Sequence, residues 1–176
     1  SGSQLRKADN IFVKTFEKIK SKSDIELIAI NDVWVGDLIY DSFLMNYKKP
    51  TIIKESQEFK DFLLNSVQLF VFWEDYLNGN DVKAISVSHC VYNLAIPLRI
   101  AVKKGIPAFQ VNATHVYRLN SQDLFAYNDF FNFRERFSSL PLEVREAGLK
   151  EAESRIKRRF SGEIGVDMGY SSKSAY

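Results

Sequence analysis

The sequence has very few of the residues and motifs that mark common metal and nucleotide sites. It contains one cysteine, Cys90, and two histidines among 176 residues. An internal disulfide is therefore excluded, and a closed metal site has too few of its usual ligands. The GxGxxG, Walker, HExxH, CxxC and GxSxG motifs are absent, which removes the usual support for dinucleotide, NTPase, zinc and serine-hydrolase chemistry. We therefore expect no resident cofactor and no metal ion.

Long apolar runs and a strong net charge are also missing. No run approaches the ~20 apolar residues that a membrane-spanning helix requires. A formal net charge of +2 gives no argument for nucleic-acid binding. The lone cysteine fits a reducing compartment, so we expect a cytoplasmic protein. The basic run at 155–160 (RIKRRF) favours either a solvated helix end or a contact with the inner face of the membrane.

Hydrophobic periodicity predicts a chain of helices around a few short strands. The first predicted elements are a helix over 5–19, a buried strand over 25–30, a helix within 35–49 and a long helix over 59–77. A strand over 82–89, a helix over 96–105, a strand over 106–112 and a further segment over 115–120 follow. The last two are an aromatic-rich helix (Phe125, Phe130, Phe131, Phe133) after an N-cap at Ser121, and a helix from Pro141 to Phe160.

The strand–helix–strand unit over 82–111 gives the clearest indication of architecture. Two parallel strands require a crossover of this kind. With helices before and after it, the unit predicts an α/β fold: a three-layer, Rossmann-like domain with a mostly parallel sheet flanked by helices. We expect residues 1–3 to be a cloning scar, residues 4–160 to form one domain, and residues 161–176 to be a tail or linker.

Polar residues follow three of the predicted strands. In open parallel sheets, ligands bind beyond the carboxyl ends of the strands, so these groups are expected to share one crevice. The three groups are Asn31, Asp32, Gly36 and Asp37; Ser86, Ser88, His89 and Tyr92; and Asn112, Thr114 and His115.

Three residues of these segments have the chemistry of a general acid or base. His89 stands at a strand end and is either a base toward a hydroxyl or a structural hydrogen-bonding residue. Asp37 and Asp41 are one helical turn apart. An N-cap explains Asp37, whereas Asp41 lies in a mostly apolar helix.

Arg99 lies in the predicted helix over 96–105. It is either a clamp for phosphate or carboxylate or a side chain that snorkels to the surface.

The sequence contains four motif runs: VGDLIYDSFL (35–44), VKAISVSHCVYNLAIPLRIAVKKGIPAFQV (82–111), RRFSGEIGVD (158–167) and the final SKSAY. In this order, the motif runs resemble bacterial surface-polysaccharide biosynthesis proteins of the capsule or O-antigen type. The resemblance is to the N-terminal half of glycosyltransferases of the GT-B arrangement, and it covers the chain from Val33 onward. It implies an acceptor-binding domain whose nucleotide-sugar donor binds mainly a separate C-terminal domain.

The resemblance also implies roles for individual residues. His89, Asp41 and Asp37 would be catalytic, with one of them removing the proton from an acceptor hydroxyl. The substrate-binding residues would be Gly36, Tyr40, Ser88, Tyr92 and Arg99. Their position after a predicted strand adds Asn112 and His115 to this set.

The implied partners are a saccharide or lipid-linked saccharide acceptor and the nucleotide-sugar donor. Separately from the resemblance, an exposed sheet edge or the aromatic-rich region at 125–137 would support pairing with a second copy of the chain. Two alternatives remain open. One is a non-catalytic sugar-binding or scaffold module of polysaccharide assembly. The other is a flavodoxin-like small-molecule enzyme with phosphate at the helix N-terminus of the first run.

Overall fold

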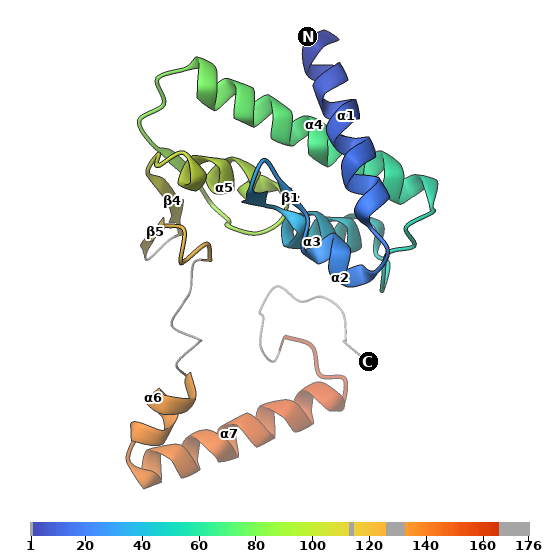
Figure 1. The fold of residues 1–176 in the computed structure, drawn as a ribbon. Coiled ribbons are helices and arrows are strands. Elements are labelled where there is room, and N and C mark those ends of the chain that lie inside the picture. Colours follow the sequence, from blue (N-terminus) through green and yellow to red (C-terminus); the bar gives the residue numbers. More distant parts are fainter. Residues whose placement is uncertain (1, 113–114, 126–132, 166–176) are drawn as a thin grey trace. The chain divides into compact units, whose positions relative to one another are not determined.

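A computed structural model describes residues 2–112, 115–125 and 133–165 (Figure 1). The chain divides into two compact units, residues 1–127 and 128–176. The sequence predicts one domain over 4–160. The first unit contains the expected mixture of helices and strands, so the α/β class is confirmed. Within the described residues, no helix is long and apolar enough to cross a membrane.

Two long helices form one side of the first unit. Helix α1 (Gly2–Lys18) packs along α4 (Gln57–Gly79), as both periodicities predict. Ser56 caps α4, because its side chain accepts a hydrogen bond from the backbone N–H of Phe59. Lys7 of α1 forms ion pairs of 2.9 Å with Glu74 and Asp75 of α4. The buried face of α4 supplies much of the hydrophobic core.

The predicted strand over 25–30 is wrong for most of its length. Helix α2 (Lys22–Glu26) occupies its first part, because Ser21 and Asp24 form a capping box. Only Ala29–Ile30 (β1) is a strand, and it pairs antiparallel with Val33–Trp34 (β2). Asn31 and Asp32 connect the two strands with positive φ angles of 50° and 61°, which asparagine and aspartate tolerate in tight turns. These two residues therefore build a hairpin turn.

Helix α3 (Gly36–Tyr47) begins at a point of close backbone approach. A Cβ atom at Gly36 would lie 2.3 Å from the carbonyl oxygen of Ile25 and 2.5 Å from that of Glu26. The backbone N–H groups of Val35 and Gly36 both donate to the carbonyl oxygen of Ile28. Gly36 therefore allows α3 to start directly against the C-terminal end of α2.

A small sheet completes the first unit. Strand β3 (Ile85–Val87) pairs parallel with β4 (Ala108–Val111), and β4 pairs antiparallel with β5 (Val116–Leu119). A short 3-10 helix, η1 (Asn93–Ala95), and helix α5 (Ile96–Lys103) connect β3 to β4. The predicted strand–helix–strand unit is thus confirmed, but the sheet is small and mixed rather than mostly parallel.

The boundaries of α5 follow the predicted signals. Pro97 lies in the first turn of the helix, where its missing N–H costs no hydrogen bond. Gly105 has a φ of +72° just beyond the end, and the N–H of Ile106 donates to the carbonyl oxygen of Ala101. This left-handed glycine cap turns the chain back toward β4.

The second unit contains α6 (Phe133–Ser139) and α7 (Leu142–Phe160), the last of which the sequence predicts. Two ion pairs join residues four apart on α7, Glu151 with Arg155 and Glu153 with Lys157. The predicted helix start at Ser121 is wrong, because Ser121 lies in a turn between the bridged residues Asn120 and Asp123. Phe130 and Phe131 lie outside the described residues.

Candidate functional site

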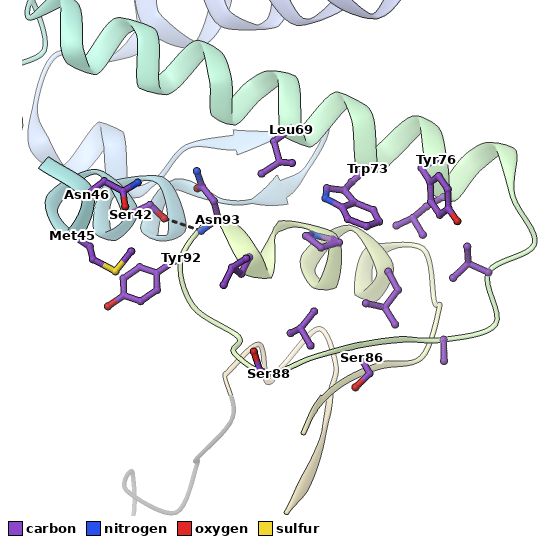
Figure 2. Close-up of a pocket in the computed structure, with 17 residues that line it drawn as sticks. Ser42, Met45, Asn46, Leu69, Trp73, Tyr76, Ser86, Ser88, Tyr92 and Asn93 are labelled. Atoms are coloured by element: carbon purple, nitrogen blue, oxygen red, sulfur yellow. Dashed lines mark hydrogen bonds between the residues drawn. The ribbon is translucent and has the colours of Figure 1, made fainter. Parts of the chain in front are cut away.

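A cavity of about 800 Å³ lies in the first unit, among α3, α4, the segment through β3 and the start of α5 (Figure 2). This volume is in the range of small-molecule sites. Its described lining residues are Ser42, Met45, Asn46, Leu69, Trp73, Tyr76, Leu77, Val82, Ala84, Ile85, Ser86, Val87, Ser88, Tyr92, Asn93, Leu94 and Pro97.

One side of the cavity is aromatic. Trp73 and Tyr76 are three residues apart on α4 and therefore share a face of the helix. Their rings meet edge to face with centroids 5.7 Å apart, and Tyr76 is 45% exposed. Figure 2 shows both side chains projecting from α4 toward the segment that carries Ser86 and Ser88. The pair offers a rigid apolar surface with a phenol hydroxyl at its edge.

Hydroxyl and amide groups hold the opposite end of the cavity. The backbone N–H of Asn93 donates to Oγ of Ser42 at 2.8 Å, and its side-chain amide donates to Oγ of Ser66 at 3.0 Å. Ser66 in turn donates to the carbonyl oxygen of Phe62. This network joins α3, α4 and η1, so the polar end of the cavity is fixed by three elements.

Tyr92 lines the cavity in a strained backbone conformation. Its φ is 58° and its ψ is −175°, a region that residues other than glycine rarely adopt. In Figure 2 its ring lies beside Met45 at the α3 end of the cavity. Such strain costs about 1–3 kcal/mol and persists where the surrounding structure imposes it. It is often found at binding and catalytic sites.

The described residues of the lining carry no formal charge. They include no aspartate, glutamate, lysine, arginine or histidine. A diphosphate or a carboxylate held there would lose water without gaining a cationic partner, which is costly. The cavity therefore suits a neutral ligand that has apolar faces and hydroxyl groups.

Arg99 and Asp37 meet each other away from the lining of this cavity. Nη2 of Arg99 lies 2.8 Å from Oδ2 of Asp37, and Nη1 donates to the carbonyl oxygen of Trp34 at 3.1 Å. The guanidinium also lies over the rings of Trp34 and Phe125, at 4.8 and 5.2 Å from their centroids. Because Arg99 is 2% exposed, the expectation that it snorkels is wrong.

The N-cap interpretation of Asp37 is also wrong. Val35 occupies the N-cap position of α3, and no side chain caps the helix there. Asp37 lies in the first turn and its carboxylate pairs with Arg99. Gly36 beside it is buried against backbone. Both residues thus have structural contacts that account for their presence.

Tyr40 and Asp41 lie near α2. Nζ of Lys22 lies 4.8 Å from the ring centroid of Tyr40, which is buried. Partial burial raises the pKa of Asp41, and the nearby carboxylates of Asp37 and Glu26 add to the effect. Lys22 opposes it. Neither Tyr40 nor Asp41 is among the residues that line the cavity.

His89 is connected to the cavity through its neighbour. Its Nδ1 lies 2.9 Å from Oγ of Ser88, and Ser88 lines the cavity together with Tyr92. The carbonyl oxygen of Ser88 accepts a hydrogen bond from the side chain of Gln110. Of the three residues predicted to be catalytic, His89 is therefore the one whose side chain hydrogen-bonds to the side chain of a lining residue.

Asn112 and His115 belong to the β4–β5 turn. The N–H of His115 donates to Oδ1 of Asn112, and the N–H of Asn112 donates to the carbonyl oxygen of His115. The imidazole stacks on the ring of Tyr117. Thr114, predicted with them, lies outside the described residues. Of the substrate-binding residues predicted, only Ser88 and Tyr92 line the cavity.

Sequence reasoning missed Trp73, Tyr76 and Asn93 as site residues. The first two lie in a helical hydrophobic pattern, which predicts a core-facing stripe. The signal that could have separated these two residues from the core is that the aromatic residues of α4 spread over more of the helix than a single buried face requires.

In comparisons with known proteins, no family model, no curated protein and no solved structure matches this chain.

Proposed function

We propose that the first unit binds a neutral saccharide in this cavity, as the acceptor-binding domain of a glycosyltransferase of surface-polysaccharide assembly. The observation that carries the proposal is the uncharged cavity with Trp73 and Tyr76 on one side and hydroxyl and amide groups around them. Sugars have apolar C–H faces and many hydroxyls, so they complement such a surface. The resemblance of the motif runs supplies the enzymatic context.

The uncharged lining also fits the proposal that acceptor and donor bind separate domains. A nucleotide-sugar donor carries a diphosphate, which helix N-termini or basic groups would hold. The described lining of the cavity offers no cation, so we assign it to the acceptor and place the donor on a separate domain. In this proposal, the β3–α5–β4 unit is the part of the fold related to a Rossmann-like domain.

Within the proposed enzyme, His89 is the candidate base and Ser88 connects it to the bound acceptor. Removing a proton from the acceptor hydroxyl would let its oxygen attack the anomeric carbon of the donor, with the nucleotide as leaving group. Asp37 is assigned to the structure through its pair with Arg99. Asp41 does not line the cavity, so we give it no role toward the acceptor.

The observed start of α3 argues against the flavodoxin-like alternative. That alternative needs free N–H groups and open space at the N-terminus of the helix. The N–H of Gly36 is already bonded to Ile28, and backbone of residues 25–28 fills the space beside it. A non-catalytic sugar-binding module uses the same cavity and differs only in lacking the transfer reaction.

Calorimetric titration of the chain with a panel of neutral and acidic surface-polysaccharide oligosaccharides tests the binding proposal. We expect neutral oligosaccharides to bind, and Trp73→Ala to weaken the binding by at least about tenfold through loss of the stacking surface. Phe133→Ala is the matched control, because Phe133 is also aromatic, is 59% exposed and is not among the lining residues. Equal losses in both variants, or no binding at all, would contradict the proposal.

A transfer assay separates the enzyme from the binding module. In a protein that contains the proposed donor domain, we expect His89→Ala to lower sugar transfer by at least about 100-fold while acceptor binding is retained. Near-normal transfer by His89→Ala removes His89 from the mechanism. Acceptor binding without any transfer, in the presence of the donor domain and a matched donor, favours the module.

A further inference from the structure

Helix α7 of the second unit carries an apolar stripe along its length. Leu142, Leu149 and Ile156 recur every seven residues, and Ala152 and Phe160 lie beside them on the same face. The four large side chains are between 55% and 66% exposed, and α7 has no buried residue. Leu142, Leu149 and Ile156 are therefore largely exposed.

A helix of this kind needs a partner for its stripe. Most of the stability of protein helices comes from packing of the apolar face rather than from intrinsic propensity. Stripes with a seven-residue repeat are typical of helices that pair with other helices at a shallow angle. The spacing of Leu142, Leu149 and Ile156 thus indicates a second helix as the cover.

The charges beside the stripe indicate which helix. Glu146, Lys150, Glu153 and Lys157 follow one another along one flank and alternate in sign. In an antiparallel pair related by a two-fold axis, this flank of one helix meets the same flank of the other. Glu146 then faces Lys157 of the second copy, and Lys150 faces Glu153. Every charge of this flank meets its opposite.

We propose that α7 is a self-association surface through which two copies of the chain pair with their α7 helices antiparallel. In the register set by the charges, Leu142 packs near Phe160 of the second copy and Leu149 near Ala152. Arg145 interrupts the stripe, and its aliphatic stem packs along it. An anionic membrane is a poorer partner, because Glu146 and Glu153 border the stripe and would be repelled.

Charge reversal tests this pairing by sedimentation equilibrium on the 176-residue chain. We expect the unmodified chain to be dimeric. Glu153→Lys and Lys150→Glu should each weaken dimerisation by about tenfold, because each puts like charges opposite one another at two symmetric places. The double variant K150E/E153K exchanges the two charges and should restore the dimer.

Effects within one helix are about equal in the three variants. Glu153 pairs with Lys157 at 2.7 Å on the same helix, Glu146 stands one turn before Lys150, and Lys150 stands three residues before Glu153. Each single variant makes two of these three neighbouring pairs like-charged, and so does the double variant. Recovery of the dimer in the double variant alone therefore requires contact between two copies.

Glu151→Lys is the matched control. It makes the same charge change on the face of α7 away from the stripe, where Glu151 pairs with Arg155, and it should leave the dimer intact. A monomeric unmodified chain at about 100 μM, or a double variant no better than the single ones, overturns the proposal. A monomer that binds anionic vesicles through α7 assigns the stripe to a membrane instead. Circular dichroism checks that each variant keeps its helices.

Discussion

Asp37 and Arg99 form an ion pair that joins the first turn of α3 to α5, with Oδ2 of Asp37 2.8 Å from Nη2 of Arg99. The side chain of Arg99 is 1% exposed and that of Asp37 is 19% exposed. The guanidinium gains further contacts from the Trp34 carbonyl oxygen and from the ring of Trp34. The pair therefore neutralises a buried charge in the first unit, so losing one partner should destabilise the fold.

Asp37→Ala should lower the free energy of unfolding by about 3 kcal/mol, because it leaves the buried Arg99 without its counter-charge. Asp37→Ala combined with Arg99→Met should lose less than the sum of the two single changes, since the double variant buries no unpaired charge. Urea denaturation measures all three. Asp81→Ala is the control: its pair with Lys83 is about as short but both side chains are at least 80% exposed, so a change below about 0.5 kcal/mol is expected.

Gly36→Ala should destabilise the protein by at least about 2 kcal/mol, because the new Cβ would lie 2.3–2.5 Å from backbone atoms of Ile25, Glu26 and Ile28. Gly148→Ala in α7 is the opposite case. Its Cβ meets nothing within 4 Å, so it should be neutral or stabilise the helix by up to about 1 kcal/mol. Thermal denaturation of both variants checks the contrast. A harmless Gly36→Ala would show that α3 does not approach α2 so closely.

Asp41→Asn should stabilise the protein at neutral pH and have little effect near pH 3. Partial burial, together with Asp37 and Glu26, raises the pKa of Asp41 above 3.8. The folded state therefore holds this proton more tightly than the unfolded state, and stability falls as the pH rises from about 3.8 through the raised pKa. Removing the carboxylate removes that loss.

Asp24→Asn provides a control of opposite sign for the pH experiment. Hydrogen bonds from the backbone of Lys20 and from Ser21 lower the pKa of Asp24. Its stabilising effect is therefore present above the ordinary value of 3.8 and is lost as the pH falls through the lowered pKa. Asp24→Asn should destabilise the protein at neutral pH. Urea midpoints that move in the same direction for both variants would contradict the assignment.

Tyr92→Gly and Tyr92→Ala should differ in stability although both remove the ring. Glycine adopts the φ of 58° without strain and alanine does not. We therefore expect the glycine variant to be more stable than the alanine variant by about 1 kcal/mol. Both should weaken saccharide binding, because both remove an aromatic side chain from the cavity. Equal stabilities in chemical denaturation would show that the backbone of Tyr92 is unstrained.

The sequence predicted best those elements that local signals delimit. Pro97 and Gly105 mark the two ends of α5, and the alternation of strand and helix patterns around them predicts the parallel pairing of β3 with β4. The run over 25–30 failed because a short apolar segment fits a strand and a buried helix equally well. There the capping box of Ser21 and Asp24 decides for the helix.

Contacts between distant residues explain why the candidate site was predicted only in part. Asp37 and Arg99 are 62 residues apart, and no periodicity indicates that one side chain neutralises the other. Trp73 has the same hydrophobic spacing as its buried neighbours on α4, so its position at a cavity depends on where the 82–88 segment lies. The sequence singled out Ser88 and Tyr92, which line the cavity, because they follow a strand end, where open α/β sheets place ligands.

The most direct test of the saccharide proposal uses the two indole N–H signals of the protein in a proton–nitrogen correlation spectrum. Trp73 lines the cavity, whereas the indole of Trp34 donates to the carbonyl oxygen of Glu26 at 2.7 Å and lies beside Arg99. Trp73→Phe assigns the signals. Titration with a neutral oligosaccharide should shift the Trp73 signal and leave that of Trp34 in place. An unchanged Trp73 signal during binding that calorimetry detects would contradict the proposal.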